Sequence, residues 1–165
     1  MVVVEGMDNT GKTTLARQQA NDLGGLYLNL RRKPRSVVDI AAYIQDTSPI
    51  RHQLVLDRHP VFSDFVYGPV VRGTSLFTHS DARILIEMMK RVAFLPVILV
   101  YCRPPTEVIL GSLSDRPQMD GVVQRAHQLI EKYDLELPFW ESLVPVVRHN
   151  YVTDTYQTLL DKLRV

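Results

Sequence analysis

The chain contains 165 residues, of which 45% are hydrophobic and 22% are charged, and its formal net charge is +1. This length suits one domain with one core, and the composition excludes a chain that is disordered as a whole. The charge balance does not indicate a surface that coats nucleic acid, and no apolar run approaches the ~20 residues of a membrane-spanning helix.

Short apolar runs alternate along the chain with stretches whose apolar residues have helical spacing. In chain order, the sequence predicts strand 1–4, helix 12–23, strand 26–30, helix 36–45, strand 54–56, helices 62–67 and 80–94, strand 96–102, a short helix ending near residue 111, helix 122–133, strand 143–147 and a final helix after residue 154. The helix at 80–94 has an apolar stripe formed by Ile84, Leu85, Met88, Met89 and Val92.

The order of these elements predicts the fold class. Apolar strands joined by helical crossovers indicate a parallel sheet that is covered on both faces. We therefore expect residues 1–165 to form one α/β domain, a three-layer sandwich with a five-stranded parallel sheet of the P-loop NTPase type. Ligands of such sheets bind beyond the carboxyl ends of the strands. Gly6, Arg31, Asp57 and Arg103 each follow a predicted strand, so they are expected along one edge.

Residues 6–13, G-M-D-N-T-G-K-T, match the pattern G-x-x-x-x-G-K-[ST] of a phosphate-binding loop. Glycines let the backbone bend so that several N–H groups point at a phosphate chain, and the following helix directs its positive end to the same place. Lys12 would contact the β and γ phosphates, and the Thr13 hydroxyl would bind Mg²⁺. The sequence thus predicts an ATP and Mg²⁺ site whose phosphate-binding residues are Asp8, Asn9, Thr10, Gly11, Lys12, Thr13 and Thr14.

The sequence lacks the elements of other nucleotide-binding classes. No guanine-reading N-K-x-D occurs, and D-R-H-P at 57–60 follows the third strand where a GTPase would have Asp-x-x-Gly. A motor or helicase normally needs a larger core and additional sensor elements. A small kinase, which moves a phosphoryl group between two bound molecules, is the remaining class.

The first ~70 residues resemble the thymidylate kinase family. Residues 5–14, E-G-M-D-N-T-G-K-T-T, are similar to the family's P-loop, and the Asp at position 8 is particular to it. L-R-R-K-P-R-S at 30–36 is similar to the basic, Pro-containing loop that handles the acceptor phosphate. D-R-H at 57–59 resembles the family's D-R-aromatic motif, and the aromatic positions 62 and 67 fit the helix after it.

Three features depart from the family pattern and indicate a compact, virus-type relative. The chain is shorter, His59 replaces an aromatic residue, and the arginine-rich lid is reduced to a segment at about 112–121 that contains Arg116. Closure of such a segment would exclude water from the site and deliver its arginine to the transferring group.

Phosphoryl transfer depends mostly on positioning and on neutralisation of charge. The predicted catalytic residues are Lys12, Asp57, Arg58 and Arg116, and Mg²⁺ would be held by Thr13 and Asp57. The resemblance implies an acceptor site formed by Asp8, near the sugar 3′-hydroxyl, and by Arg32, Arg35, Arg58, Phe62, Tyr67 and Arg72. Analogy with kinases of this architecture places Arg103, Asn150 and Tyr151 on the adenine side.

These features predict a single P-loop kinase domain that transfers a phosphoryl group from ATP to a deoxynucleoside monophosphate, with dTMP, converted to dTDP, as the expected acceptor. One alternative is a deoxynucleoside kinase, which would phosphorylate a 5′-hydroxyl and need a carboxylate such as Asp57 as the base. Another is a nucleotide-gated, DNA-associated protein with slow ATP hydrolysis. The expected partners are ATP and a dNMP, without stable nucleic-acid binding, and the resemblance implies a homodimer through helix 80–94.

The cysteine and the histidines do not indicate a disulfide or a metal site. Cys102 is the only cysteine, so neither a disulfide nor a cysteine zinc cluster is expected, and it should be a buried apolar side chain. The five histidines show no spacing typical of metal ligands. Residues 1–5 do not resemble a secretion signal, and a soluble, cytoplasmic protein is expected.

Overall fold

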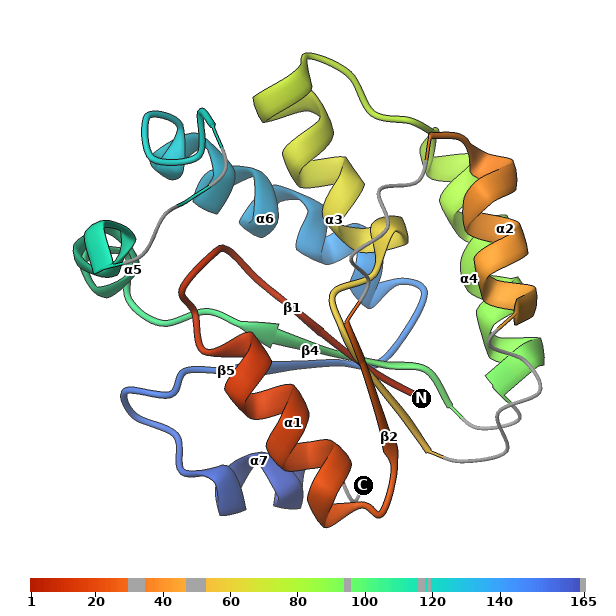
Figure 1. Cartoon of the computed structure of the whole chain (residues 1–165), viewed down its shortest axis with the longest axis horizontal. Helices are drawn as coiled ribbons and strands as arrows, with labels where there is room; N and C mark the ends of the chain where they lie inside the picture. The colour runs from red at the N-terminus through yellow and green to blue at the C-terminus, as the bar shows by residue number, and fades with distance from the viewer. Residues whose placement is uncertain (30–34, 47–52, 94–95, 116–117, 119, 164–165) are drawn as a thin grey trace.

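The computed structural model describes residues 1–29, 35–46, 53–93, 96–115, 118 and 120–163. Its elements are β1 (Val2–Glu5), α1 (Lys12–Asp22), β2 (Leu26–Asn29), α2 (Val37–Asp46), β3 (Leu54–Asp57), α3 (Pro60–Tyr67), the π-helical turn η1 (Gly68–Arg72), α4 (His79–Ala93), β4 (Ile98–Cys102), α5 (Thr106–Ser112), the 3₁₀ turn η2 (Leu113–Asp115), α6 (Ala126–Glu141), β5 (Val146–His149) and α7 (Tyr156–Leu163). Figure 1 shows α1 and α7 on one face of the sheet, and α2, α3, α4 and α6 on the other.

The strands form one sheet in the order β2-β3-β1-β4-β5, and every neighbouring pair is parallel. The predicted five-stranded parallel sheet is therefore confirmed, although the last strand, Val146–His149, lies later than the predicted 143–147. β1 is the central strand, with Val4 paired to Asp57 of β3. The loop after β1 consequently opens at the middle of the carboxyl edge.

Alternate residues of β1 divide the core between the two faces of the sheet, as the period of two in a strand requires. Val2 and Val4 belong to a cluster with Leu15 of α1 and Leu159 of α7. Val3 belongs to the larger cluster, which is formed with the helices on the opposite face. The sheet is thus covered on both sides, and its carboxyl edge is left for ligands.

Helix α6 begins and ends later than the predicted helix at 122–133. It spans Ala126–Glu141, because Leu137 and Trp140 continue its buried face beyond the predicted end. Pro138 lies inside this helix and removes one intrahelical hydrogen bond. The apolar area that Leu137 and Trp140 bury outweighs that loss.

Helix α3 ends at Tyr67, as the sequence predicts, and begins two residues earlier than predicted, at Pro60. The α-helical pattern stops before Gly68, and the chain proceeds into the π-helical turn Gly68–Arg72. Gly68 is required in this turn, since a Cβ there would lie 2.8 Å from the carbonyl oxygen of Thr74. π-helical turns are rare and are frequently found near functional sites.

The apolar stripe of α4 is used mainly within the chain. Leu85 and Met89 are buried in the larger cluster, whereas Ile84 is 62% exposed. α4 packs against α2, as Figure 1 shows. Most of the stripe that predicted a dimer is therefore covered by this chain's own helices.

Two expectations drawn from the composition can be compared with the structure. Cys102 is a buried free thiol, as predicted. Throughout the described ranges, every helix is too short or too polar to cross a bilayer.

Candidate nucleotide-binding site

The loop between β1 and α1 bends sharply at two glycines. Gly6 has a φ of +143°, and a Cβ there would lie 2.5 Å from the carbonyl oxygen of Cys102. Gly11, the N-cap of α1, has a φ of +77°. Asn9 is also left-handed, with a φ of 59°, a conformation in which Asn is enriched among non-glycine residues. These bends leave the amino end of α1 facing the carboxyl edge of the sheet, where anions bind.

A cavity of about 520 Å³ opens beside this loop. The loop forms one wall, and the others come from the ends of β2 and β3, from the end of α5 and from the segment after β5. The lining residues are Asp8, Asn9, Thr10, Gly11, Lys12, Thr13, Thr14, Asn29, Asp57, Arg58, Ser112 and Tyr151. Every residue that the sequence predicts to bind ATP phosphates therefore lines one cavity.

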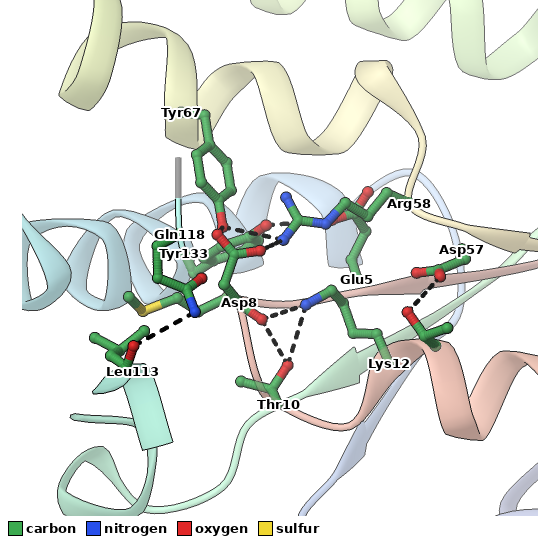
Figure 2. Close-up of polar contacts among 12 residues, drawn as sticks. Glu5, Asp8, Thr10, Lys12, Asp57, Arg58, Tyr67, Leu113, Gln118 and Tyr133 are labelled. Atoms are coloured by element: carbon green, nitrogen blue, oxygen red, sulfur yellow. Dashed lines mark hydrogen bonds and ion pairs between the residues drawn. The ribbon is translucent and has the colours of Figure 1, made fainter. Parts of the chain in front are cut away.

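Lys12 is folded over the loop that precedes it. Its Nζ donates to the backbone oxygen of Met7 and lies 3.4 Å from Oγ1 of Thr10 (Figure 2). The side chain is buried, and this burial lowers the pKa of the ammonium to about 8. Phosphate oxygens are stronger acceptors for an ammonium than a neutral carbonyl. A nucleotide in the cavity would therefore compete well for Lys12.

Asp57 lies at the end of β3 and is held by three donors. Oδ2 accepts hydrogen bonds from Thr13 Oγ1 at 2.6 Å, from Asn29 Nδ2 at 2.8 Å and from the Tyr27 hydroxyl at 3.0 Å. The three donors come from α1 and from β2, so elements far apart in the sequence fix one carboxylate. Figure 2 shows Asp57 on the Lys12 side of the site.

The pair formed by Thr13 and Asp57 fits the predicted Mg²⁺ site. Mg²⁺ is commonly bound by one or two carboxylates together with substrate phosphates, and it keeps several waters. One buried carboxylate and one hydroxyl beside the phosphate loop match this pattern. Among the described residues there is no group of three or more His, Cys, Asp or Glu side chains that could hold a metal by themselves. The cation would consequently depend on the nucleotide for the rest of its ligands.

Arg58 directly follows Asp57 in the chain and forms a cluster with an acid and an aromatic residue. Its Nη2 forms an ion pair with Asp8 and lies 3.2 Å from the Tyr67 hydroxyl. The same hydroxyl donates to Asp8 Oδ2 at 3.3 Å, and the guanidinium lies 4.9 Å from the centre of the Tyr67 ring. These three residues were all predicted for the acceptor side, and the structure brings them together.

Glu5, at the end of β1, lies near this cluster, and the sequence did not lead us to predict it as a functional residue. It is fully buried, and its carboxylate accepts from the backbone N–H of His59 at 2.7 Å and from the Tyr133 hydroxyl at 3.2 Å. Burial raises the pKa of Glu5 to about 7, against the opposing effect of the nearby Arg58 charge. The available signal was an acidic residue at the end of an otherwise apolar strand.

Several predicted acceptor residues lie elsewhere. Phe62 is fully buried in the core, 5.8 Å from the Trp140 ring, and does not line the cavity. Arg72 forms an ion pair with Asp64 and is likewise absent from the lining. The structure therefore brings neither residue into the cavity wall.

The basic residues predicted on either side of the cavity divide into two groups. Arg35 is exposed, its backbone N–H donates to Asp39 Oδ2 at 2.7 Å, and it does not line the cavity. Arg32 and Arg116, predicted for the acceptor and for the lid, lie outside the described residues. The structure therefore brings only Lys12 and Arg58, of the predicted cations that it describes, into the cavity wall.

On the predicted adenine side, only Tyr151 lines the cavity. Its ring lies 3.4 Å from the position that a Cβ at Gly11 would occupy. Arg103 instead forms an ion pair with Asp134 at 3.1 Å. Asn150 Oδ1 accepts from the backbone N–H of Val152 at 3.1 Å and so shapes the loop that presents Tyr151.

Two lining residues were not predicted as site residues, although Ser112 begins the predicted lid segment. Asn29 reaches the cavity from the end of β2, and Ser112 does so from the end of α5. Asn9 Nδ2 donates to the backbone oxygen of Ser112 at 2.6 Å. This bond links the phosphate loop to the start of the predicted lid segment.

Comparison with known proteins identifies the fold. No family model matches the sequence, and no curated protein does so. The structure is similar to that of the YorR protein from Bacillus subtilis in complex with phosphorylated GDP, with a TM-score of 0.74 and 15% identity over 99% of this chain and 92% of that one. It is also similar to deoxyadenosine kinase from M. mycoides with bound dATP, with a TM-score of 0.63 and 13% identity over 99% of both chains.

A third similar structure is shikimate kinase from Acinetobacter baumannii in complex with shikimate, with a TM-score of 0.53 and 17% identity over 99% of this chain and 89% of that one. The fold is that of the P-loop kinases. At these identities the similarity concerns the fold alone, so the resemblance to thymidylate kinases stays a prediction.

Proposed function

We propose that this protein transfers the γ-phosphoryl group of ATP to a deoxynucleoside monophosphate, with dTMP as the first candidate acceptor. The observation that carries the proposal is that two groups of charged and polar residues line one cavity. One group is Lys12 with the Thr13–Asp57 pair, and the other is the Asp8–Arg58 pair. A triphosphate donor and a second anionic substrate would meet between them.

The donor would bind along the phosphate loop. The backbone N–H groups of the loop and the amino end of α1 would face the phosphates, and Lys12 would move from Met7 to the β and γ phosphates. The ring of Tyr151, beside Gly11, would contact the adenine. Thr13 and Asp57 would hold Mg²⁺, which would neutralise part of the phosphate charge.

The acceptor would bind against Asp8, Arg58 and Tyr67. In line with the family resemblance, Asp8 would accept a hydrogen bond from the sugar 3′-hydroxyl. Arg58 would contact the acceptor phosphate and the transferring group, because its guanidinium lies in the cavity wall beside the phosphate loop. Arg32, Arg35 and the lid residue Arg116 are proposed as further phosphate contacts on binding.

In the reaction, an oxygen of the acceptor phosphate forms a bond to the γ-phosphorus of ATP while the bond from that phosphorus to the β–γ bridging oxygen breaks. The products are ADP and a deoxynucleoside diphosphate. An ionised phosphate oxygen is already a competent nucleophile, so no side chain has to act as a strong general base. The contribution of Lys12 and Arg58 is to offset the repulsion between two anions and to orient them.

The test is to incubate the protein with ATP, Mg²⁺ and each deoxynucleoside monophosphate in turn, and each deoxynucleoside in parallel, and to separate the products chromatographically. A deoxynucleoside diphosphate that forms with the wild type, and not with Lys12→Ala, supports the proposal. ATP turnover that is stimulated only by DNA would instead indicate the DNA-associated protein.

A deoxynucleoside kinase is the second candidate, and one feature of the site favours it. Of the described cations in the cavity wall, Arg58 is already paired with Asp8, which leaves Lys12 for the donor. A site with little free positive charge suits a neutral nucleoside better than a monophosphate. In that case Asp57 would take the proton of the 5′-hydroxyl, and the same assay would yield a monophosphate.

Two further expectations remain proposals. A homodimer through α4 would have to use Ile84 and its exposed neighbours, because Leu85 and Met89 are buried within the chain. Size-exclusion chromatography with light scattering would give the oligomeric state. A soluble, cytoplasmic protein would remain in the supernatant when cells that produce it are fractionated.

A further inference from the structure

We propose that Glu5 is a positioning residue, which holds the backbone of Arg58 in the conformation from which its guanidinium reaches Asp8 and the cavity. The inference rests on the proposed function, because it gives Arg58 a role in phosphoryl transfer. It goes beyond that function in naming a buried residue that contacts neither substrate.

Arg58 has a backbone conformation that needs support. Its φ is +72°, in the left-handed region, which is unfavourable for a residue with a Cβ. Such conformations persist only where the surrounding structure determines them, and they are concentrated at functional sites. The two backbone N–H groups at this point are both tied to β1, since Arg58 N donates to Val4 O at 3.0 Å and His59 N donates to Glu5 Oε1 at 2.7 Å.

Glu5 connects three elements of the fold at this point. It belongs to β1, its Oε1 accepts from the turn between β3 and α3, and its Oε2 accepts from Tyr133 of α6 at 3.2 Å. Figure 2 shows Glu5 and Tyr133 in one group with Arg58, and it shows Asp8 and Tyr67 near the Arg58 guanidinium. The hydrogen bonds to β1 therefore fix the backbone at Arg58, and Asp8 and Tyr67 orient its side chain.

A carboxylate in this place is costly, which argues that it has a specific task. Glu5 is 0% exposed, and a buried ionised group is unfavourable unless it is paired and hydrogen-bonded. Burial raises the pKa of Glu5 to about 7, so the side chain is destabilised as an anion. An apolar residue at the end of β1 would avoid this cost but would leave the N–H of His59 without an acceptor.

Two substitutions of similar volume separate the anchoring hydrogen bond from simple filling of space. Glu5→Gln keeps an oxygen that can accept from the His59 N–H, whereas Glu5→Met cannot accept it. We expect Glu5→Met to lower kcat by about tenfold or more with the KM for ATP within about threefold of wild type, and Glu5→Gln to retain kcat within about threefold.

The position of Arg58 can be read directly by NMR in protein labelled with ¹⁵N-arginine. The Nε–H resonance of Arg58 is assigned by its loss in Arg58→Lys. We expect this resonance to keep its position in Glu5→Gln and to shift or broaden in Glu5→Met. The shift does not depend on turnover, so it tests the link between the two residues even if the wild type transfers no phosphoryl group, a result that would overturn only the proposed function.

Wild-type kcat in Glu5→Met, or a loss of kcat with an unchanged Arg58 resonance, would overturn the inference. If Glu5→Met does not fold, Tyr133→Phe decides, because it removes the second hydrogen bond to Glu5. Its matched control is Tyr101→Phe, since the Tyr101 ring stacks on Tyr133 at 5.6 Å but its hydroxyl donates to Asp134. Only Tyr133→Phe should lower kcat and shift the Arg58 resonance; equal behaviour of the two variants would count against the role of Glu5.

Discussion

The hydroxyl of Thr13 donates to Oδ2 of Asp57 over 2.6 Å and joins the first turn of α1 to the end of β3. Tyr27 and Asn29 donate to the same oxygen, so three donors fix the position of the carboxylate. A preorganised carboxylate beside the phosphate loop needs little rearrangement to receive a cation that arrives with a nucleotide.

Replacement of Asp57 should therefore affect the requirement for Mg²⁺ first. In Asp57→Asn we expect the Mg²⁺ concentration for half-maximal activity to rise by about tenfold or more, because a neutral amide is a weaker ligand for a hard cation. The control is Asp134→Asn, whose carboxylate pairs with Arg103 away from the cavity. Titration of activity, and of Mn²⁺ binding in the presence of ADP, would measure the change. Identical cation dependence in the two variants would contradict the assignment.

Lys12→Ala should remove phosphoryl transfer while the fold is retained. We expect a loss of at least ~100-fold in kcat/KM, which corresponds to ~2.7 kcal/mol of transition-state stabilisation. Burial lowers the pKa of Lys12 to about 8, so the ammonium is not favourable for folding and its removal should not destabilise the empty protein. The midpoint of thermal unfolding should stay near the wild-type value without ATP and lose its increase with ATP. Activity close to wild type would remove the phosphate loop from the mechanism.

Two glycines offer a matched test of the loop geometry. Gly6→Ala should destabilise the protein by about 2 kcal/mol or more, because the new Cβ would lie 2.5 Å from a backbone oxygen and the φ of +143° is strained for alanine. Gly24→Ala has a φ of +58° with nothing within 4 Å of the Cβ, so it should cost only ~1 kcal/mol. Urea unfolding of the two variants would give the difference, and equal losses would show that the close approach at Gly6 is relieved without cost.

His59 should make the protein sensitive to acid. Burial lowers its pKa from 6.5 to about 3, so between these values the unfolded chain binds a proton that the folded protein does not. Stability from this residue is complete above pH 6.5 and is lost as the pH falls, by about 2 kcal/mol at pH 5. Glu5, with its pKa raised from 4.5 to about 7, acts in the opposite direction over pH 4.5–7.

The contribution of His59 can be separated from that of Glu5 with His59→Asn. Nδ1 of His59 accepts from Val61 N at 3.2 Å and caps α3, and asparagine can also cap a helix without taking up a proton. The free energy of unfolding of the wild type should fall more than that of the variant between pH 7.5 and pH 5. Parallel pH profiles, measured by urea unfolding, would show that His59 does not carry this effect.

The resemblance to thymidylate kinases implies an acceptor role for both Phe62 and Tyr67, and their positions on α3 explain why the two rings have different neighbours. Residues five apart on an α-helix point about 140° apart, so their side chains meet different parts of the fold, and neither of these two lines the cavity. Phe62 packs in the core, whereas the Tyr67 hydroxyl reaches Arg58 and Asp8. The aromatic pattern was visible in the sequence, but the direction of each ring depended on which side of α3 the sheet covers.

The sequence by itself determined the order of strands and helices, because apolar periodicity is a local property, and it determined the phosphate loop, because the glycines, Lys12 and Thr13 act within one short segment. Only the tertiary structure decided which distant side chains share the site. The hydrogen bond from Asn29 to Asp57 joins residues more than 25 positions apart. The same is true of the ion pair between Arg58 and Asp8 and of the hydrogen bonds from His59 and Tyr133 to Glu5. Contacts of that kind follow from strand order and register, which bring separate segments to one edge of the sheet, and no local spacing encodes them.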